Sequence, residues 1–159
     1  MPDSYTRIAI VTGATSGIGE ATVRQFITAG FGVIGNGRTA SRLAALENEL
    51  GSAFLGIVGD ATDEAVLESL FTRADEHFGK PVDIVIANAG RGLGGAVSTV
   101  EPDAFRDTLN INVTGALTLL QKAARRMEKV QLSHYPDSAA DIVVIGSVVG
   151  RQGCRQDTN

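Results

Sequence analysis

Small and polar residues gather in this sequence at points where a nucleotide could be held. The first group is Thr12-Gly13-Ala14-Thr15-Ser16-Gly17-Ile18-Gly19, after a short apolar run. Glycines here let a backbone turn sharply and approach a pyrophosphate, and the N-terminus of a following helix offers free N–H groups to that anion. A tight turn alone would also need glycine. The position after the first strand of an alternating pattern favours nucleotide binding.

Further candidate residues follow later apolar runs or lie in a helix. They are Asp60-Ala61, Asn88-Ala89-Gly90, Asn112 and Ser147. Asp60 has two interpretations, because a carboxylate there could cap the following turn or contact a ligand. A lone serine after a strand is by itself typical of a turn. No residue pattern predicts a metal site.

Short apolar runs alternate with helical periods, which predicts one α/β domain over residues 1–159. Strands are expected at 8–11, 31–34, 54–58, 82–87 and 142–145. Helices are expected at 17–29, 43–50, 62–78, from Pro102 onward, and at 113–127, with Thr62 as an N-cap and 129–141 as a surface loop that holds His134 and Tyr135. Right-handed crossovers then give a Rossmann-type, doubly wound parallel sheet in the order 3-2-1-4-5.

Composition narrows the setting and the partners. The net charge is −4, so nucleic acid or an acidic membrane surface is not expected as the main partner. Cys154 is the single cysteine, which excludes an internal disulfide and favours a reduced, cytoplasmic location. No apolar run is long enough to cross a membrane.

The spacing Thr12-Gly13-x3-Gly17-Ile18-Gly19 resembles that of the short-chain dehydrogenase/reductase family, and the later groups match that family's motifs in order over residues 7–150. The resemblance implies a hydride transfer between a nicotinamide cofactor and a small alcohol or carbonyl substrate, in a homo-oligomer, a dimer or tetramer. It implies catalytic roles for Asn112 and Ser147. It implies cofactor contacts for Gly13, Thr15, Ser16, Gly17, Ile18, Gly19, Arg38, Asp60, Ala61, Asn88, Ala89 and Gly90.

The end of the second strand bears on which cofactor is used. An acidic residue there would favour NAD by accepting hydrogen bonds from the ribose 2′-OH. The sequence instead reads Gly35-Asn36-Gly37-Arg38, and Arg38 could meet a 2′-phosphate. NADP is therefore the predicted cofactor, with NAD as the alternative. The opposing interpretation of Arg38 is a solvated side chain that opens the next helix.

One element of the family pattern is absent. No Tyr-x-x-x-Lys occurs in the 159 residues, and the matching tyrosine would be expected just beyond Asn159. The polar segment 151–159 after a clean match suggests an altered reading frame or a truncated chain, which would lack the C-terminal strands and be inactive as written. The alternatives are a non-catalytic nucleotide-binding fragment or pseudoenzyme, and a module that keeps the fold for interaction only.

Overall fold

The computed structural model describes residues 5–131 and 140–147, and His134, Tyr135, Cys154 and the segment 151–159 lie outside them. Within the described residues, five parallel strands form one sheet in the order β3-β2-β1-β4-β5, which confirms the predicted topology. The strands are β1 (Ile8–Thr12), β2 (Gly32–Gly37), β3 (Phe54–Val58), β4 (Ile84–Ala87) and β5 (Asp141–Val144).

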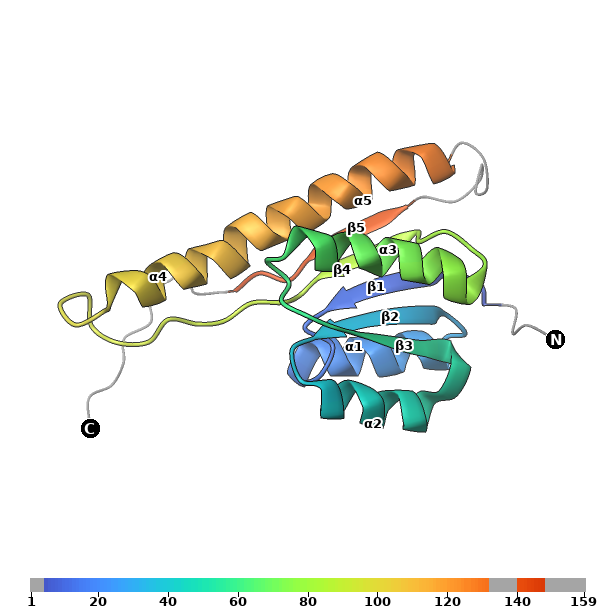
Figure 1. Cartoon of the computed structure of the whole chain (residues 1–159), viewed down its shortest axis with the longest axis horizontal. Coiled ribbons are helices and arrows are strands. Elements are labelled where there is room, and N and C mark those ends of the chain that lie inside the picture. Colours follow the sequence, from blue (N-terminus) through green and yellow to red (C-terminus); the bar gives the residue numbers. More distant parts are fainter. Residues whose placement is uncertain (1–4, 132–139, 148–159) are drawn as a thin grey trace.

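Helices cover both faces of this sheet (Figure 1). One layer holds α1 (Gly17–Thr28) and α2 (Ala40–Leu50), and the other holds α3 (Glu64–Phe78) and α5 (Ala116–Gln131). A short 3₁₀ turn, η1 (Gly51–Ala53), leads from α2 into β3. The arrangement is the doubly wound sheet that the alternation predicts.

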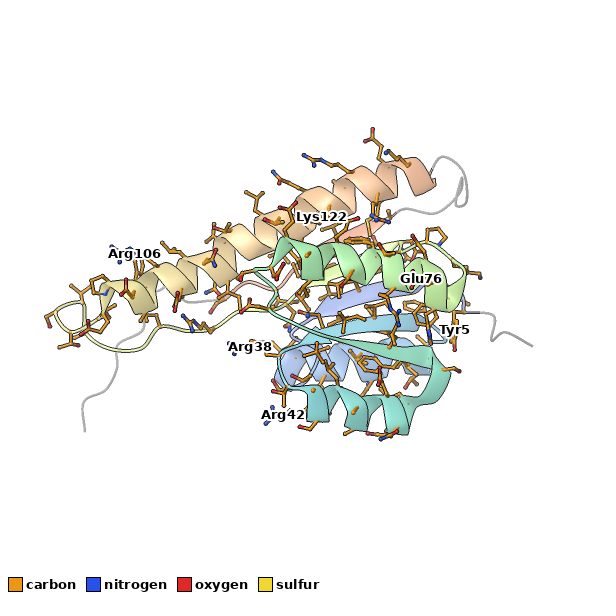
Figure 2. The ribbon with its side chains drawn as sticks, in the orientation of Figure 1. Tyr5, Arg38, Arg42, Glu76, Arg106 and Lys122 are labelled. Atoms are coloured by element: carbon orange, nitrogen blue, oxygen red, sulfur yellow. The ribbon has the colours of Figure 1, made fainter. Side chains whose placement is uncertain are left out.

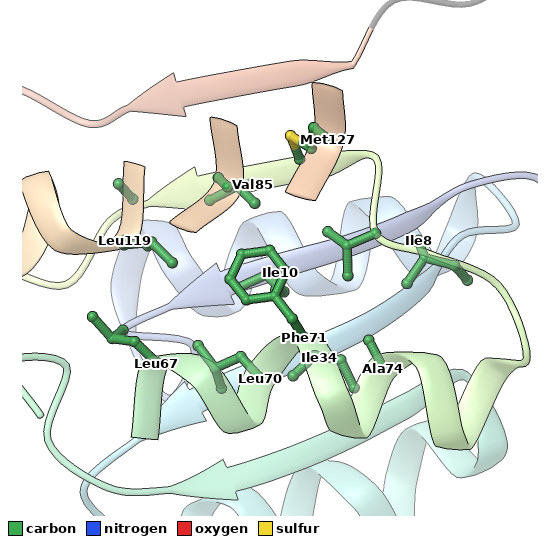
Figure 3. Close-up of a cluster of buried hydrophobic side chains, with 13 residues drawn as sticks. Ile8, Ile10, Ile34, Leu67, Leu70, Phe71, Ala74, Val85, Leu119 and Met127 are labelled. Atoms are coloured by element: carbon green, nitrogen blue, oxygen red, sulfur yellow. The ribbon is translucent and has the colours of Figure 1, made fainter. Parts of the chain in front are cut away.

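The central strand β1 contributes side chains to the buried clusters on both faces of the sheet, because successive side chains of a strand point to opposite faces. Ile8 and Ile10 pack with α3 and α5, whereas Ala9 and Val11 pack with α1 and α2. Figure 3 shows the first of these clusters, in which Phe71 lies among side chains from the sheet and from both helices. The apolar residues of β1 are 0% exposed, so this strand is the fixed centre from which the candidate site extends.

The start of α3 differs from the prediction. Thr62 was expected to be the N-cap, but the cap is Asp63, whose carboxylate accepts hydrogen bonds from the backbone N–H of Ala65 at 2.8 Å and of Val66 at 3.4 Å. The hydroxyl of Thr62 donates instead to Asp60. The helix ends as predicted at Gly79, which has a left-handed φ of 64°.

The predicted helices at Pro102 and at 113–127 form one continuous helical run. It consists of α4 (Pro102–Leu109), a π-helical turn η2 (Asn110–Gly115) and α5. The backbone stays in the right-handed helical region at Asn110 and Ala116, so nothing interrupts the run. The run also continues to Gln131, inside the segment that was predicted as a loop from 129 onward. Within the described residues, no helix is long and apolar enough to cross a bilayer.

A buried carboxylate ties three strands together at their N-terminal ends. Asp83 is 3% exposed, accepts the backbone N–H of Ile8 at 3.0 Å and pairs with Arg7 at 2.8 Å. Arg7 also reaches Asp141 at the start of β5, again at 2.8 Å. This network therefore holds β1, β4 and β5 together at their N-terminal ends, which lie at the end of the sheet opposite to the candidate site.

Candidate functional site

The glycine-rich turn between β1 and α1 is packed too closely for side chains. Gly13 and Gly17 have left-handed φ values of 66° and 54°. A Cβ atom on Gly13 would lie 2.9 Å from Nδ2 of Asn88, and one on Gly19 would lie 2.1 Å from the carbonyl oxygen of Gly13. The turn thus keeps its backbone open to a ligand at the N-terminus of α1.

A clamp between Thr12 and Asn88 joins the ends of β1 and β4. The Asn88 amide donates to the carbonyl of Thr12 at 2.9 Å, and the hydroxyl of Thr12 accepts the backbone N–H groups of Asn88 and Ala89 at 3.1 and 3.0 Å. Thr12 is 2% exposed, so these bonds are made away from water. The sequence predicts that Asn88 ties its strand to a neighbour, but it does not identify Thr12 as the other half of the clamp.

A cleft of about 380 Å³ lies along the carboxyl ends of the strands. Nine of the predicted cofactor-binding residues line it, namely Gly13, Thr15, Ser16, Ile18, Arg38, Ala61, Asn88, Ala89 and Gly90. Six residues that the predictions did not include also line it, namely Asn36, Gly37, Thr39, Arg42, Gly59 and Ile111. The remaining predicted residues, Gly17, Gly19, Asp60, Asn112 and Ser147, lie outside this lining.

Two exposed arginines stand at one end of the cleft. Arg38 follows β2, and Arg42 lies in the first turn of α2, one helical turn further along (Figure 2). Among the residues that the structure describes, neither has a carboxylate within salt-bridge distance, in contrast to Arg24 and Arg126. Both guanidinium groups are therefore available to an anion. The spacing of four residues was the signal that could have pointed to Arg42.

The end of β2 has no room for an acidic side chain. A Cβ atom on Gly37 would lie 2.6 Å from Cγ2 of Thr15, which itself lines the cleft. The neighbouring Asn36 is 1% exposed and donates from its amide to the carbonyls of Ile57 and Gly59, both at 3.1 Å. These bonds fix the ends of β2 and β3 relative to each other, so the wall of the cleft is rigid here.

Asp60 takes the capping role, which is one of the two interpretations that its sequence position left open. Its Oδ1 accepts the backbone N–H of Thr62 at 2.9 Å and the hydroxyl of Thr62 at 2.8 Å, which is the capping role. These two bonds lower the pKa of the carboxyl, and the charges of Arg38 and Arg91 lower it further. The residue is exposed, and Ala61, directly after it, lines the cleft. An ionised carboxylate therefore stands at the rim.

Of the two predicted catalytic residues, Asn112 contacts the loop after β4, and Ser147 follows the neighbouring strand β5. The Asn112 side chain accepts the backbone N–H of Arg91 at 2.9 Å and donates to the carbonyl of Arg91 at 2.8 Å. Ser147 is exposed and lies just past β5, which pairs with β4 through Ala87 and Val144. Parallel pairing thus places Ser147 at the carboxyl ends of the strands, where the cleft lies.

The π-helical turn that carries Asn112 is pressed against the cleft. A Cβ atom on Gly115 would lie 2.7 Å from the carbonyl oxygen of Ala61, and one on Gly90 would lie 3.0 Å from Oδ1 of Asn112. The helical run is therefore distorted at the point where it approaches the backbone after β3. π-Helical turns are frequent at functional sites.

The family described as short chain dehydrogenase matches residues 7–158 of the chain. Serine 3-dehydrogenase from Agrobacterium fabrum is 43% identical over 137 residues, which are 80% of this chain and 55% of that protein. The 3-oxoacyl-(acyl-carrier-protein) reductase FabG from Salmonella typhimurium is 31% identical over 147 residues, which are 92% of this chain and 57% of that protein. The chain spans a little more than half the length of these relatives.

Solved structures show the same likeness. The 3-ketoacyl-(acyl-carrier-protein) reductase from Brucella melitensis, solved in complex with NADH, has a TM-score of 0.84 at 28% identity and covers 92% of this chain and 59% of its own. A second protein from Brucella melitensis, named as a short-chain dehydrogenase/reductase, has a TM-score of 0.82 at 23% identity. It covers 96% of this chain and 61% of its own, and it shares the fold.

Proposed function

Because the chain belongs to the short-chain dehydrogenase family of oxidoreductases, we propose that it forms the cofactor-binding part of an enzyme that transfers a hydride between NADP(H) and a small alcohol or carbonyl substrate. The observation that carries the choice of cofactor is the pair of unpaired arginines, Arg38 and Arg42, at one end of the cleft. When bound, the nicotinamide of such a cofactor gives or accepts the hydride.

The glycine turn fits a pyrophosphate. The backbone at Gly13, Gly17 and Gly19 leaves no side chain between a ligand and the N-terminus of α1. The free N–H groups and the positive end of the helix dipole attract an anion at that point. Ser16 and Thr15 line the cleft beside the turn and can donate hydroxyl hydrogen bonds to phosphate oxygens.

The other end of the cleft favours a 2′-phosphate over a free ribose hydroxyl. Arg38 and Arg42 offer two planar cations, and a guanidinium can bind phosphate in a bidentate manner. The contact of Gly37 with Thr15 leaves no room for the carboxylate that would hold a 2′-OH. NAD remains the alternative cofactor, and the relative from Brucella melitensis was solved with NADH.

Ser147 and Asn112 are proposed to take part in the reaction in different ways. The hydroxyl of Ser147 would donate a hydrogen bond to the substrate carbonyl and so polarise it. Asn112 holds the backbone of Arg91 by two hydrogen bonds and so positions the loop that follows Gly90. The general acid or base is not among these residues, because the sequence has no Tyr-x-x-x-Lys.

The test of the cofactor assignment is a titration of NADP and NAD against the wild type and the variant Arg38→Ala. Loss of a charged phosphate contact should cost about 1.5–3 kcal/mol, which is roughly 10- to 150-fold in NADP affinity. NAD affinity should stay unchanged. Arg125→Ala is the matched control, because Arg125 is also exposed and lies in α5, away from the cleft. Equal affinity of the wild type for NAD and NADP would contradict the assignment.

As the alternative function, we propose that these 159 residues, which contain no Tyr-x-x-x-Lys, bind a nucleotide without catalysing a reaction. General acid–base catalysis typically contributes about 10²–10⁴-fold, so the 159-residue chain should bind cofactor without appreciable turnover. Sequencing the coding region beyond codon 159 in every frame separates the two functions. A Tyr-x-x-x-Lys found there supports the enzyme, and turnover by the purified 159-residue chain would contradict the need for that motif.

A further inference from the structure

Arg91 starts from a fixed point at the edge of the cleft. Asn112 holds its backbone N–H and its backbone carbonyl at 2.9 and 2.8 Å, and Gly90, directly before it, lines the cleft. A side chain whose backbone is held on both sides can swing without moving the loop. The position of its guanidinium is therefore decided by the partners within its reach.

The present partner of Arg91 is weakly bound. Its Nη2 lies 3.3 Å from Oδ2 of Asp107 on α4, and the two side chains are 41% and 73% exposed. Exposed ion pairs of this kind contribute about 0–1 kcal/mol. Asp107 precedes Ile111 by four residues in the continuous helical run, so both lie on one helix face, and Ile111 lines the cleft. The guanidinium of Arg91 thus pairs with the helix face that carries Ile111 of the cleft lining one turn further along.

Asp60, at the rim of the cleft, lies within the range of two cations, Arg38 and Arg91. The pKa of its carboxyl is lowered first by its bonds from Thr62 and then by the charges of these two arginines. Asp60 follows β3, whereas Arg91 follows β4 and Arg38 follows β2. Of these two cations, Arg91 is the one that forms an ion pair within the described residues, with the exposed carboxylate of Asp107.

We propose that Arg91 closes the adenine end of the cleft, where its guanidinium leaves Asp107 and stacks on the open face of the adenine ring. The inference rests on the proposed nucleotide function, in which Arg38 and Arg42 fix the adenosine ribose through its 2′-phosphate. The base then lies toward Asp60 and Ala61. Both cations are attracted to an aromatic face, but only the planar guanidinium can also lie parallel to the ring and stack on it.

The test compares ADP, NAD, NADP and 2′,5′-ADP by calorimetry on the 159-residue chain. Arg91→Ala should weaken all four ligands alike, by roughly fivefold, which is about 1 kcal/mol. Arg38→Ala should weaken only NADP and 2′,5′-ADP, because only these carry the 2′-phosphate. Asp107→Asn removes the competing carboxylate and should strengthen all four by about twofold.

Two controls separate stacking from charge and from damage to the fold. Arg91→Lys keeps the charge but not the plane, so most of the loss should persist. Arg106→Ala removes an exposed arginine from α4 that pairs with Asp103 and should change nothing. Wild-type affinity in either Arg91→Ala or Arg91→Lys would overturn the inference. Absence of binding of all four ligands to the wild type would instead contradict the proposed function itself.

Discussion

Strands β1 and β5 have similar apolar sequences but opposite surroundings. Ile8, Ala9, Ile10 and Val11 of β1 are 0% exposed, whereas Ile142, Val143 and Val144 of β5 are 39%, 42% and 53% exposed. β1 has a strand on each side and helices on both faces, while β5 is the last strand of the sheet within the described residues. None of the residues of β5 belongs to either buried cluster. Apolar composition therefore indicates a strand, and neighbours decide its burial.

The same contrast runs along the continuous helical run. In α5, Leu119, Ala123 and Met127 are at most 3% exposed and pack on the sheet. An apolar stripe at intervals of four residues, formed by Phe105, Leu109, Val113 and Leu117, is 44–56% exposed. Figure 1 shows α4 extending beyond the sheet. The molecule thus has a packed part, which holds the cleft, and a part whose apolar surface is open.

The largest expected effect is on stability, and two phenylalanines, one in each part of the molecule, test the contrast. Phe71→Ala empties a core position that is 1% exposed and should cost about 3–5 kcal/mol of the free energy of unfolding. Phe105→Ala changes a side chain that is 49% exposed and should cost less than about 1 kcal/mol in the monomer. Urea unfolding of both variants measures the difference. Similar losses would show that the part with the open apolar surface is packed as tightly as the core.

The next effect concerns the glycine turn. Gly19→Ala forces a Cβ atom against the carbonyl oxygen of Gly13. We therefore expect the free energy of unfolding to fall by about 1–3 kcal/mol, and nucleotide binding to be lost as well. Gly92→Ala is the control, because no atom lies within 4 Å of the added Cβ position there. Thermal melts measure the stability of each variant, and NADP titrations measure its nucleotide binding. Normal NADP affinity in Gly19→Ala would contradict the packing described for the turn.

The third prediction concerns the part whose apolar surface is open. We propose that the apolar stripe mediates homo-oligomer formation, and we expect the 159-residue chain to be self-associated or prone to aggregation. Val113→Asp should weaken self-association by at least about tenfold, or 1.4 kcal/mol. Asn48→Asp places the same charge on exposed α2 and should have no effect. Light scattering over a concentration series distinguishes the variants, and a monomeric wild type would contradict the proposal.

The smallest expected effect concerns the ion pairs that join α3 to α5. Hydrogen bonds from Arg126 and Lys122 lower the pKa of Glu68 below its ordinary value near 4.5. A carboxyl with a lowered pKa contributes stability that is present above the ordinary pKa and is lost as the pH falls through the lowered one. Glu68→Gln should therefore cost less than about 1 kcal/mol at pH 7 and reduce the loss of stability in acid.

Asp75 on the same helix provides a contrast of opposite sign. Burial raises its pKa, partly offset by the charge of Arg126, so its protonation favours the folded state as the pH falls. Asp75→Asn should make the stability fall more steeply in acid, whereas Glu68→Gln makes it fall less. Unfolding curves measured from pH 7 to pH 3 give the free energy of unfolding as a function of pH for each variant. An equal dependence on pH in the two variants would contradict these assignments.

Local patterns were enough to predict the sheet order and most of the cleft. Alternating strands and helices leave few topologies once crossovers are right-handed, and glycine spacing marks the turn at Gly13 without any tertiary information. Arg38 was found because the segment 35–38, after the predicted strand 31–34, has no carboxylate and ends in an arginine. The cap at Asp63 was missed because Thr62, an equally good capping residue, stands next to it, and only the bond from Thr62 to Asp60 decides between them.

The remaining features depend on contacts that are distant in sequence. The hydroxyl of Thr12 meets the backbone of Asn88 across 76 positions, and Asn112 meets Arg91 across 21. The π-helical turn lies where Gly115 approaches Ala61, a closeness that no helical period reveals. The sequence by itself thus determined which elements form and in what order, because these follow from local periodicity. The tertiary structure alone decided which apolar faces are covered and which polar groups meet, because both depend on neighbours in space.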